Sequence, residues 1–411
     1  MPNARPFDVD FVRGQFPALR DDWALFDNAG GSLACQQVIH RVTTYLEHYG
    51  IQLGATYPRS LEAAELVRRG RQAAADLVNA DLEEVVITGS TTMSAYILAH
   101  AMAPNLKPGD NIVVTDIDHE ANIGAWRRLE ERGVELREWR HNADSLALEM
   151  DELKPLLDER TRLVTFSHCP NVTGSIHDAH AIIATAHDAG AQVCVDGVAF
   201  APHRRVDVRD LDADYYLVSL YKVFGPHQGL LFGKREHLRD AVGQNHYFIT
   251  EDEVPYKLQP GNVNHELTAS LPGIVEYLET LASHHGVTCD STHEALNAAF
   301  DLIASQEATL VAPLIAYLRD RDDVRIIGRP TEDADARVAT VAFEVEGRSS
   351  TEVTTLLQEH HVAVRFGDFY ARRGVARMPL LHSDGMVRVS MAHYNHPEEV
   401  ARLIAALDQI K

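Results

Sequence analysis

The stretch DYYLVSLYKVFGP, residues 214–226, leads from an apolar, strand-like segment into a turn that carries Lys222. The segment 214–220 is aromatic, β-branched and almost wholly apolar, which is typical of a strand covered on both faces in a parallel sheet. Gly225 and Pro226 then close a tight turn. Most lysines are solvated surface charges, and that interpretation applies to Lys222 too. A partly buried lysine, however, has a pKa low enough for its amine to act as a nucleophile.

Short apolar runs of the same character recur upstream, at residues 85–88, 111–114, 162–166 and 192–195. Helical patterns separate them, for example at 121–132 and at 179–189, and Gly190 follows the second as a stop signal. This alternation of strands and helices predicts an α/β fold in which right-handed crossovers build a mostly parallel sheet.

Downstream of Gly286 the pattern becomes that of a smaller α/β domain. We expect a long helix, interrupted at Pro313 and ending near Arg321, then elements at 324–327, 338–345, 351–360, 362–365 and 386–390, and a last helix from Pro397. The predicted organisation has three parts: an N-terminal segment, residues 1–25, that packs on the small domain; a large domain, residues 26–285; and the connecting helix with the small C-terminal domain, residues 286–411.

Composition excludes several classes of protein. The 411 residues include 38 Lys+Arg and 60 Asp+Glu, a formal net charge of −22, which argues against a nucleic-acid partner. The four cysteines, at 35, 169, 194 and 289, lie far apart and match neither a disulfide framework nor a zinc finger. The N-terminus lacks the apolar stretch of a signal peptide, and no run approaches the roughly 18 residues of a membrane span. We expect a cytoplasmic protein without a membrane partner or a metal site.

Polar residues follow the strand-like runs where each run ends, and ligands of open α/β sheets bind outside these carboxyl ends. They are Ser90, Thr91 and Thr92 at a helix start, His119, Asn171, Asp196, and Lys222. Each alone has a structural explanation, such as a helix cap, a turn or a surface charge. Their order along the chain is more specific than any one of them.

That order matches the needs of one cofactor. Small hydroxyl residues at a helix N-terminus favour a phosphate, and a carboxylate after an apolar strand needs a positive partner. An aldehyde cofactor with a phosphate and a pyridine nitrogen meets both, because the lysine forms its Schiff base and the acid keeps its ring nitrogen protonated. We therefore predict pyridoxal 5′-phosphate. A dinucleotide or nucleoside triphosphate is not indicated, since neither glycine fingerprint is present.

Over nearly its whole length the chain resembles the class V aminotransferases, which are pyridoxal-phosphate enzymes of fold type I, and within them the cysteine desulfurase and selenocysteine lyase branch. The motifs that carry the resemblance are Phe26-Asp27-Asn28-Ala29-Gly30-Gly31, Ser90-Thr91-Thr92, Asp118-His119-Glu120-Ala121-Asn122-Ile123, Asn171-Val172-Thr173-Gly174, Asp196-Gly197, Ser219-Leu220-Tyr221-Lys222 with Gly225-Pro226, Gly261-Asn262-Val263-Asn264, and Arg388-Val389-Ser390-Met391-Ala392-His393-Tyr394-Asn395.

The resemblance implies a role for each matched residue. Lys222 would hold the cofactor and move the substrate Cα proton, Asp196 would pair with the pyridinium, and His119 would stack on the ring. The other cofactor contacts would come from Thr91, Thr92 and Ser219 at the phosphate, Asn171 at the phenolic oxygen, and Gly261 and Asn262 at the phosphate of a neighbouring subunit. Tyr221 replaces the histidine usual before the lysine and Asn262 replaces the turn threonine, and either side chain could still reach a phosphate. Asn28, Arg388 and Tyr370 would bind the substrate, with the Arg388 guanidinium on its carboxylate. The implied assembly is a homodimer with shared active sites.

Departures from the family pattern bear on the reaction. Desulfurases of the family carry a nucleophilic cysteine on a loop of the small domain, and here that loop reads Arg365-Phe366-Gly367-Asp368-Phe369-Tyr370-Ala371. Tyr370 stands where the cysteine would be, and a phenol cannot accept sulfur as a persulfide. Cys169 falls beside Asn171, and a buried, unreactive thiol is the favoured interpretation of it.

The resulting hypothesis is an enzyme that acts on an α-amino acid by desulfurase-like lyase chemistry, either β-elimination or C–S cleavage without a persulfide. Transamination and epimerisation remain alternatives, because each begins with the same removal of the Cα proton. A non-catalytic, cofactor-binding regulatory protein is the alternative of another class.

Overall fold

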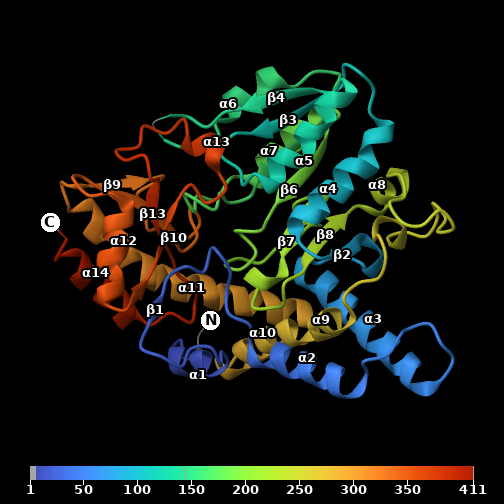
Figure 1. Cartoon of the computed structure of the whole chain (residues 1–411), viewed down its shortest axis with the longest axis horizontal. Helices are drawn as coiled ribbons and strands as arrows, with labels where there is room; N and C mark the ends of the chain where they lie inside the picture. The colour runs from blue at the N-terminus through green and yellow to red at the C-terminus, as the bar shows by residue number, and fades with distance from the viewer. Residues whose placement is uncertain (1–5, 144, 411) are drawn as a thin grey trace.

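The computed structural model describes residues 6–143 and 145–410 as two α/β units joined by one long helix (Figure 1). In the figure the large unit lies to the right, the small C-terminal unit in orange and red lies to the left, and helix α11 (Thr292–Arg319) runs beneath both. Residues 1–5 of the predicted N-terminal segment lie outside the described residues.

Within the described residues a seven-stranded sheet forms the centre of the large unit. Its strands, in order across the sheet, are β2 (Val85–Thr88), β8 (Gly229–Gly233), β7 (Tyr215–Ser219), β6 (Gln192–Asp196), β5 (Thr161–Ser167), β3 (Asn111–Thr115) and β4 (Glu135–Trp139). Only β8 runs antiparallel to its neighbours among these strands. The prediction of a mostly parallel sheet is confirmed.

Helices cover both faces of this sheet. Alternate strand residues enter different hydrophobic clusters: Val85 and Ile87 pack toward one face, whereas Val86 packs toward the other. The first face is covered by α2 (Gln36–His48), α3 (Pro58–Val78), α7 (Ala179–Asp188) and α10 (Pro272–His284), and the second by α4 (Thr91–Met102), α5 (Ala121–Arg127) and α8 (Arg235–Asp240). Coverage of both faces explains why the strands read as continuous apolar runs rather than alternating ones.

The small unit contains an antiparallel sheet in the order β12-β13-β10-β9 within the described range. Its strands are β9 (Val324–Ile327), β10 (Thr340–Val345), β12 (Arg365–Gly367) and β13 (Met386–Ser390). Helices α12 (Ser350–Glu359) and α14 (Pro397–Leu407) pack on it with the second half of α11. Three further short helices are α6 (Met150–Leu153), α9 (His265–Ser270) and α13 (Arg372–Val375). The described residues thus form an α/β structure with a large unit and a smaller C-terminal unit, in agreement with the predicted α/β class.

Helix α11 (Thr292–Arg319) corrects one detail of the prediction, because it continues through Pro313 without a break. A proline inside a helix costs about 3 kcal/mol. Apolar residues on both sides of Pro313 are buried, with Phe300 in the core of the large unit and Leu310 and Leu314 in that of the small unit. Packing on two cores therefore outweighs the local cost. This helix is also long and apolar enough to span a membrane by composition alone, but more than half of that window is buried inside the protein, as in the core helix of a globular fold.

The described part of the N-terminal segment contacts both units. Strand β1 (Ala24–Leu25) pairs in parallel with β11 (Val362–Ala363) of the small unit. Helix α1 (Val9–Gly14) is followed by Phe16, whose ring packs edge-on against Phe224 of the large unit. The segment thereby ties the two units together beside the opening of the site described next.

Candidate active site

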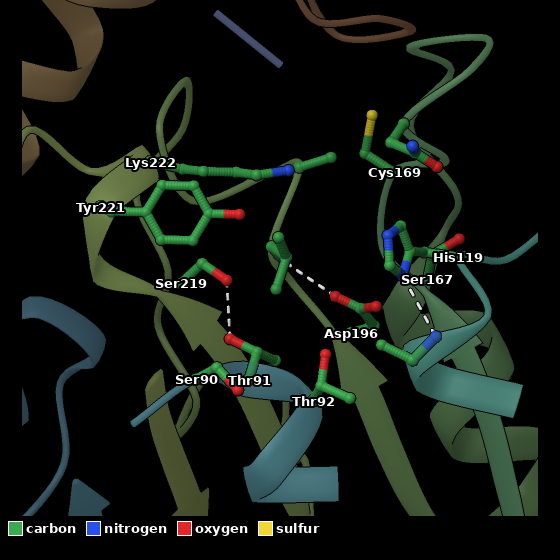
Figure 2. A pocket seen from close by; sticks show the side chains of 14 residues that line it. Ser90, Thr91, Thr92, His119, Ser167, Cys169, Asp196, Ser219, Tyr221 and Lys222 are labelled. Atoms are coloured by element: carbon green, nitrogen blue, oxygen red, sulfur yellow. Dashed lines mark hydrogen bonds between the residues drawn. The ribbon is translucent and has the colours of Figure 1, made fainter. Parts of the chain in front are cut away.

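The carboxyl ends of β5, β6 and β7 meet the first turn of α4 at an inner cavity, as parallel strands of an open sheet should. Its lining residues come from these strand ends and the turns that follow them: Ser90, Thr91, Thr92, His119, Ala121, Ser167, Cys169, Asn171, Asp196, Val198, Ala199, Ser219, Tyr221 and Lys222. Figure 2 shows the hydroxyl groups of Ser90, Thr91, Thr92 and Ser219 in the lower part of the view and Lys222 reaching across the top.

Lys222 ends a 3₁₀ turn (Leu220–Lys222) that follows β7 directly. The residue is 6% exposed, and its amine has neither a hydrogen bond nor an ion pair among the described residues. Burial, together with the nearby positive charge of Arg388, lowers the pKa of Lys222 to about 8. The amine is therefore available in its neutral, nucleophilic form close to neutral pH.

Asp196 is the last residue of β6 and is 5% exposed. Its Oδ1 accepts a hydrogen bond of 2.9 Å from the backbone N–H of Val198, and its Oδ2 has no hydrogen bond in the described structure. Burial raises the pKa of Asp196 to about 6. Gly197 is required beside it, because a Cβ there would lie 2.0 Å from the ring of Tyr216. A cationic group against the free oxygen would offset the cost of this buried carboxylate.

The hydroxyl end of the cavity is built on the N-terminus of α4. Ser90 caps the helix by accepting a bond of 3.2 Å from the N–H of Met93. Thr91 Oγ1 lies 2.9 Å from the backbone oxygen of Val218 and 2.7 Å from Ser219 Oγ, so it ties the helix to β7. The predicted phosphate-binding residues are thus brought together, but the Thr91 hydroxyl is already engaged. The Thr92 hydroxyl and the exposed N–H groups of the helix start remain to bind an anion.

His119 and Asn171 line the cavity from two separate turns. His119 Nδ1 accepts a bond of 3.1 Å from the N–H of Ala121, which leaves Nε2 to carry the ring proton. Burial and the charge of Lys222 lower the pKa of His119 to about 4, so the imidazole is neutral. Asn171 donates from Nδ2 to the Phe369 carbonyl at 2.9 Å, while its Oδ1 is buried without a partner in the described residues.

A second, outer cavity shares His119, Asn171, Tyr221 and Lys222 with the inner one. Its other lining residues come from the segment after β1 and from the small unit: Ala29, Gly30, Arg365, Phe366, Gly367, Asp368, Phe369, Tyr370 and Arg388. Lys222 therefore lies at the junction of two cavities, one lined by hydroxyl groups and a carboxylate and the other by two arginines.

Arg388 lies on β13 and is 2% exposed. It donates to the backbone oxygen of Asn171 at 3.2 Å and pairs with Asp27 at 3.2 Å. The Phe369 ring centroid lies 3.9 Å from its guanidinium carbon, a cation–π contact that covers one face of the group. This guanidinium is thus held in place with its remaining edge available to a carboxylate.

Tyr370 lies at the mouth of the outer cavity. Its side chain is 71% exposed, and its ring centroid is 5.2 Å from that of His119. Both Phe369 and Tyr370 have positive φ angles, +51° and +60°, in the left-handed region that side chains rarely adopt. Such strain is retained where the surroundings impose it, often at functional loops. Tyr221 lines both cavities and stacks on His227, with ring centroids 4.7 Å apart.

Asn28 lies in a buried hydrogen-bond network. Its Nδ2 donates to the carbonyls of Leu25 and Ser390, and its Oδ1 accepts from the Tyr394 hydroxyl. Its hydrogen-bonding groups are used in this buried network, and Asn28 is not among the residues that line either cavity. That it binds substrate stays a prediction. The hydrogen bonds of Asn28 fix the segment that presents Ala29 and Gly30.

Gly261 and Asn262 also lie apart from both cavities of the chain that carries them. They belong to the loop before α9, Asn262 is exposed, and Gly261 has a φ of +74°. The subunit contact expected of them requires a second copy of the chain.

Sequence reasoning assigned no role to Asp27 or Arg365, which contact each other at 2.6 Å beside Arg388. They are more than 300 positions apart in the chain, so only strand pairing brings them together. Cys169 lines the inner cavity but is 1% exposed, and burial raises the pKa of its thiol to about 12. No cluster of three or more metal-ligating side chains occurs in the part of the chain that the structure describes.

The donor set fits pyridoxal phosphate. A helix start with the Thr92 hydroxyl and unpaired N–H groups suits the phosphate, the unpaired amine of Lys222 suits the aldehyde, and the free oxygen of Asp196 suits a protonated ring nitrogen. The neutral imidazole of His119 suits a stacking contact. The buried amide of Asn171, with one orphaned atom, is the group that a polar substituent of the ring would satisfy.

Fold and site together define a pyridoxal-phosphate-dependent enzyme of fold type I. The family model of the class V aminotransferases matches residues 24–403, and the chain belongs to that family. It is 36% identical to the aminotransferase-like protein FGM3 of Gibberella zeae, over 98% of both chains. It is 34% identical to the cysteine desulfurase-like protein ustD of Aspergillus flavus, over the whole of this chain and 92% of that protein. Among solved structures, the cysteine desulfurase CsdA of Escherichia coli superposes with a TM-score of 0.83, at 28% identity and 98% coverage of both chains. The resemblance seen in the motifs is thereby confirmed at the level of the family.

Proposed function

We propose that this enzyme binds pyridoxal phosphate at Lys222 and acts on an α-amino acid as a lyase that expels the substituent on Cβ. The observation that carries the proposal is the buried, unpaired amine of Lys222 at the junction of the two cavities. The inner cavity offers the groups for the cofactor, and the outer cavity offers Arg388 for the substrate carboxylate. A substrate bound to Arg388 would thus place its Cα beside the only amine that lines both cavities in the described structure.

The residues divide the work as follows. Arg388 holds the α-carboxylate, and Phe369 shields the guanidinium from water. Lys222 has a pKa of about 8 in the cofactor-free protein, and its amine, when not bound to the cofactor, would accept the Cα proton. Asp196 keeps a positive charge on the ring nitrogen, and the bound cofactor supplies the electron sink that makes Cα acidic. The electron pair left at Cα then forms a double bond to Cβ as the substituent leaves with its own bonding pair.

This reaction requires no persulfide. The loop from Arg365 to Ala371 contains no cysteine, and Tyr370 stands at its exposed position. The thiol of Cys169 lines the cofactor side of the site, is almost fully buried and stays protonated at neutral pH. We therefore propose that any C–S cleavage by this enzyme releases the sulfur to solvent or to a small acceptor.

Transamination is the second candidate, supported by the similarity to a protein named aminotransferase-like. Removal of the Cα proton by Lys222 is common to both reactions, as it is to epimerisation. A purely regulatory role is disfavoured, because a scaffold has no need of an amine, a buried acid and a carboxylate-binding arginine in one site.

The first experiment is spectroscopic. Purified protein supplied with pyridoxal phosphate should become yellow, and Lys222→Ala should abolish that colour, because no other amine lines the inner cavity among the described residues. A panel of amino acids, scored for keto acid, released sulfide, amino-group transfer and loss of chirality, then separates elimination, transamination and epimerisation. A colourless protein that takes up no pyridoxal phosphate would contradict the proposal.

We also propose that the active enzyme is a homodimer in which the loop with Gly261 and Asn262 completes the site of the other subunit. Support comes from the exposure of this loop and its absence from both cavities of the same chain in the described structure. The large unit also exposes apolar side chains, including Tyr57, Leu61 and Met93, of the type that a second copy would cover.

A further inference from the structure

Arg365 and Arg388 face each other because they are cross-strand partners. Strand β12 pairs antiparallel with β13, and the register sets Arg365 directly opposite Arg388. Side chains at opposed positions project from the same face of a sheet, and like charges in that arrangement are destabilising. Both arginines line the outer cavity. The pair therefore needs a negative group between its members.

Asp27 supplies that group. Its Oδ2 lies 2.6 Å from Nη2 of Arg365, and its Oδ1 lies 3.2 Å from Nη2 of Arg388. The backbone holds Asp27 in register through an isolated parallel bridge to Ser390, two residues beyond Arg388 on β13. In addition, Ser390 N–H donates to the Phe26 carbonyl at 2.7 Å. Backbone pairing with β13 thus holds the Asp27 carboxylate beside Arg388 of the same strand.

The two contacts of Asp27 are unequal. The shorter one is to Arg365, whose side chain is 57% exposed, and the longer one is to the buried Arg388. Arg388 Nε is buried without a hydrogen-bond partner in the described residues. An unsatisfied buried donor is costly, and a guanidinium edge with a free N–H matches a carboxylate that accepts two bonds. Arg388 therefore retains the capacity to bind a further carboxylate, whereas Arg365 satisfies Asp27.

We propose that Asp27 and Arg365 form a positioning pair. The pair allows the α-carboxylate of a substrate to replace the Asp27 carboxylate on Arg388, an inference that rests on the proposed function. In the free enzyme the two arginines share the single negative charge of Asp27. When the α-carboxylate of a substrate binds Arg388, Asp27 stays with Arg365, so neither arginine is left without a counter-charge. Arg365 thus keeps the resident carboxylate from competing with the substrate.

Removal of Arg365 tests this exchange. In Arg365→Gln, Asp27 has only Arg388 as a charged partner and competes more strongly with an incoming carboxylate. We expect the dissociation constant of L-alanine, measured by spectral titration of the pyridoxal-phosphate-loaded enzyme, to rise roughly tenfold. The double variant Asp27→Asn/Arg365→Gln removes the competitor, so its dissociation constant should return to within about threefold of the parent value. Ethylamine has no carboxylate, and its binding should be the same in all these proteins.

Arg319→Gln is the matched control, because Arg319 is an exposed arginine that is paired with Glu332 and lines neither cavity. It should leave both titrations unchanged. Thermal melting shows whether each variant is folded, and Arg365→Met repeats the test if the glutamine variant melts below the parent. A double variant that binds L-alanine as weakly as Arg365→Gln, or more weakly, would overturn the exchange. A parent enzyme whose spectrum responds to neither L-alanine nor ethylamine would instead overturn the proposed function and this inference together.

Discussion

Lys222 and Asp196 are buried ionisable residues whose pKa values both shift toward the neutral form. Neither has a charged partner within hydrogen-bonding distance among the described residues. Buried groups without such compensation destabilise a folded protein and persist where function requires them. A ligand that provides an aldehyde for one and a cationic nitrogen for the other relieves both costs.

Because the buried amine of Lys222 destabilises the cofactor-free protein, replacing Lys222 should stabilise that protein. The unfolded chain holds the Lys222 proton up to the ordinary pKa of 10.5, whereas the folded protein releases it above about 8. Folding at pH 7 therefore carries a penalty of about 3 kcal/mol that disappears as the pH rises from 8 to 10.5. Lys222→Met should raise the free energy of unfolding at pH 7 by up to that amount, and the gain should shrink at pH 10. Urea unfolding at both pH values measures it, and a gain independent of pH would contradict this explanation.

At the scale of elements, helix α13 attaches the Phe369–Tyr370 loop to the turn that carries His119. Arg373 forms two bonds with Glu120, at 2.8 and 2.9 Å, and the Glu120 N–H donates to the Tyr370 carbonyl at 2.8 Å. Gly374 allows the close approach, because a Cβ there would lie 2.8 Å from the Asp116 carbonyl oxygen. The arginine run at 372–373 is therefore part of a contact between the two units rather than a simple solvated face.

Arg377 extends this contact and provides a test of it. It bonds Asp116 at 2.9 Å and Glu138 at 2.8 Å, and the Asp116 side chain is fully buried. Arg377→Gln should lower the free energy of unfolding by about 1–3 kcal/mol, because a buried carboxylate loses a charged partner. Arg68→Gln removes an exposed helical pair with Glu65, which solvent screens, and should cost clearly less. Urea unfolding of the two variants compares them, and equal losses would show that the α13 contact contributes no more than a surface pair.

At the scale of the whole molecule, the site described in one chain lacks the loop that the family resemblance assigns to it. Asn262→Ala should therefore leave the fold of each chain unchanged while weakening cofactor retention roughly tenfold. Light scattering gives the oligomeric state, and dialysis followed by absorbance gives the retained pyridoxal phosphate. A monomeric protein that retains its cofactor fully would contradict the shared site.

Much of the fold was predictable because its main determinants are local. Continuous apolar runs, each followed by a helix, required a sheet covered on both faces, and such a sheet brings Asp196, Lys222 and the start of α4 to one edge. The predicted interruption of α11 at Pro313 was wrong, because the local cost of the proline is small compared with the packing of the helix on two cores.

The amino-acid sequence by itself determined the class of fold, the family, and the order of the cofactor-facing residues, because each depends on a strand and the turn that follows it. Only the tertiary structure decided that Asn28 bonds Ser390 and Tyr394 and that Asp27 bridges Arg365 and Arg388. These contacts join segments more than 300 residues apart, and their geometry depends on the register of β12 on β13 and on the bridge from Asp27 to Ser390. Pairing register is a property of the packed sheets, so no local pattern in the chain carries it.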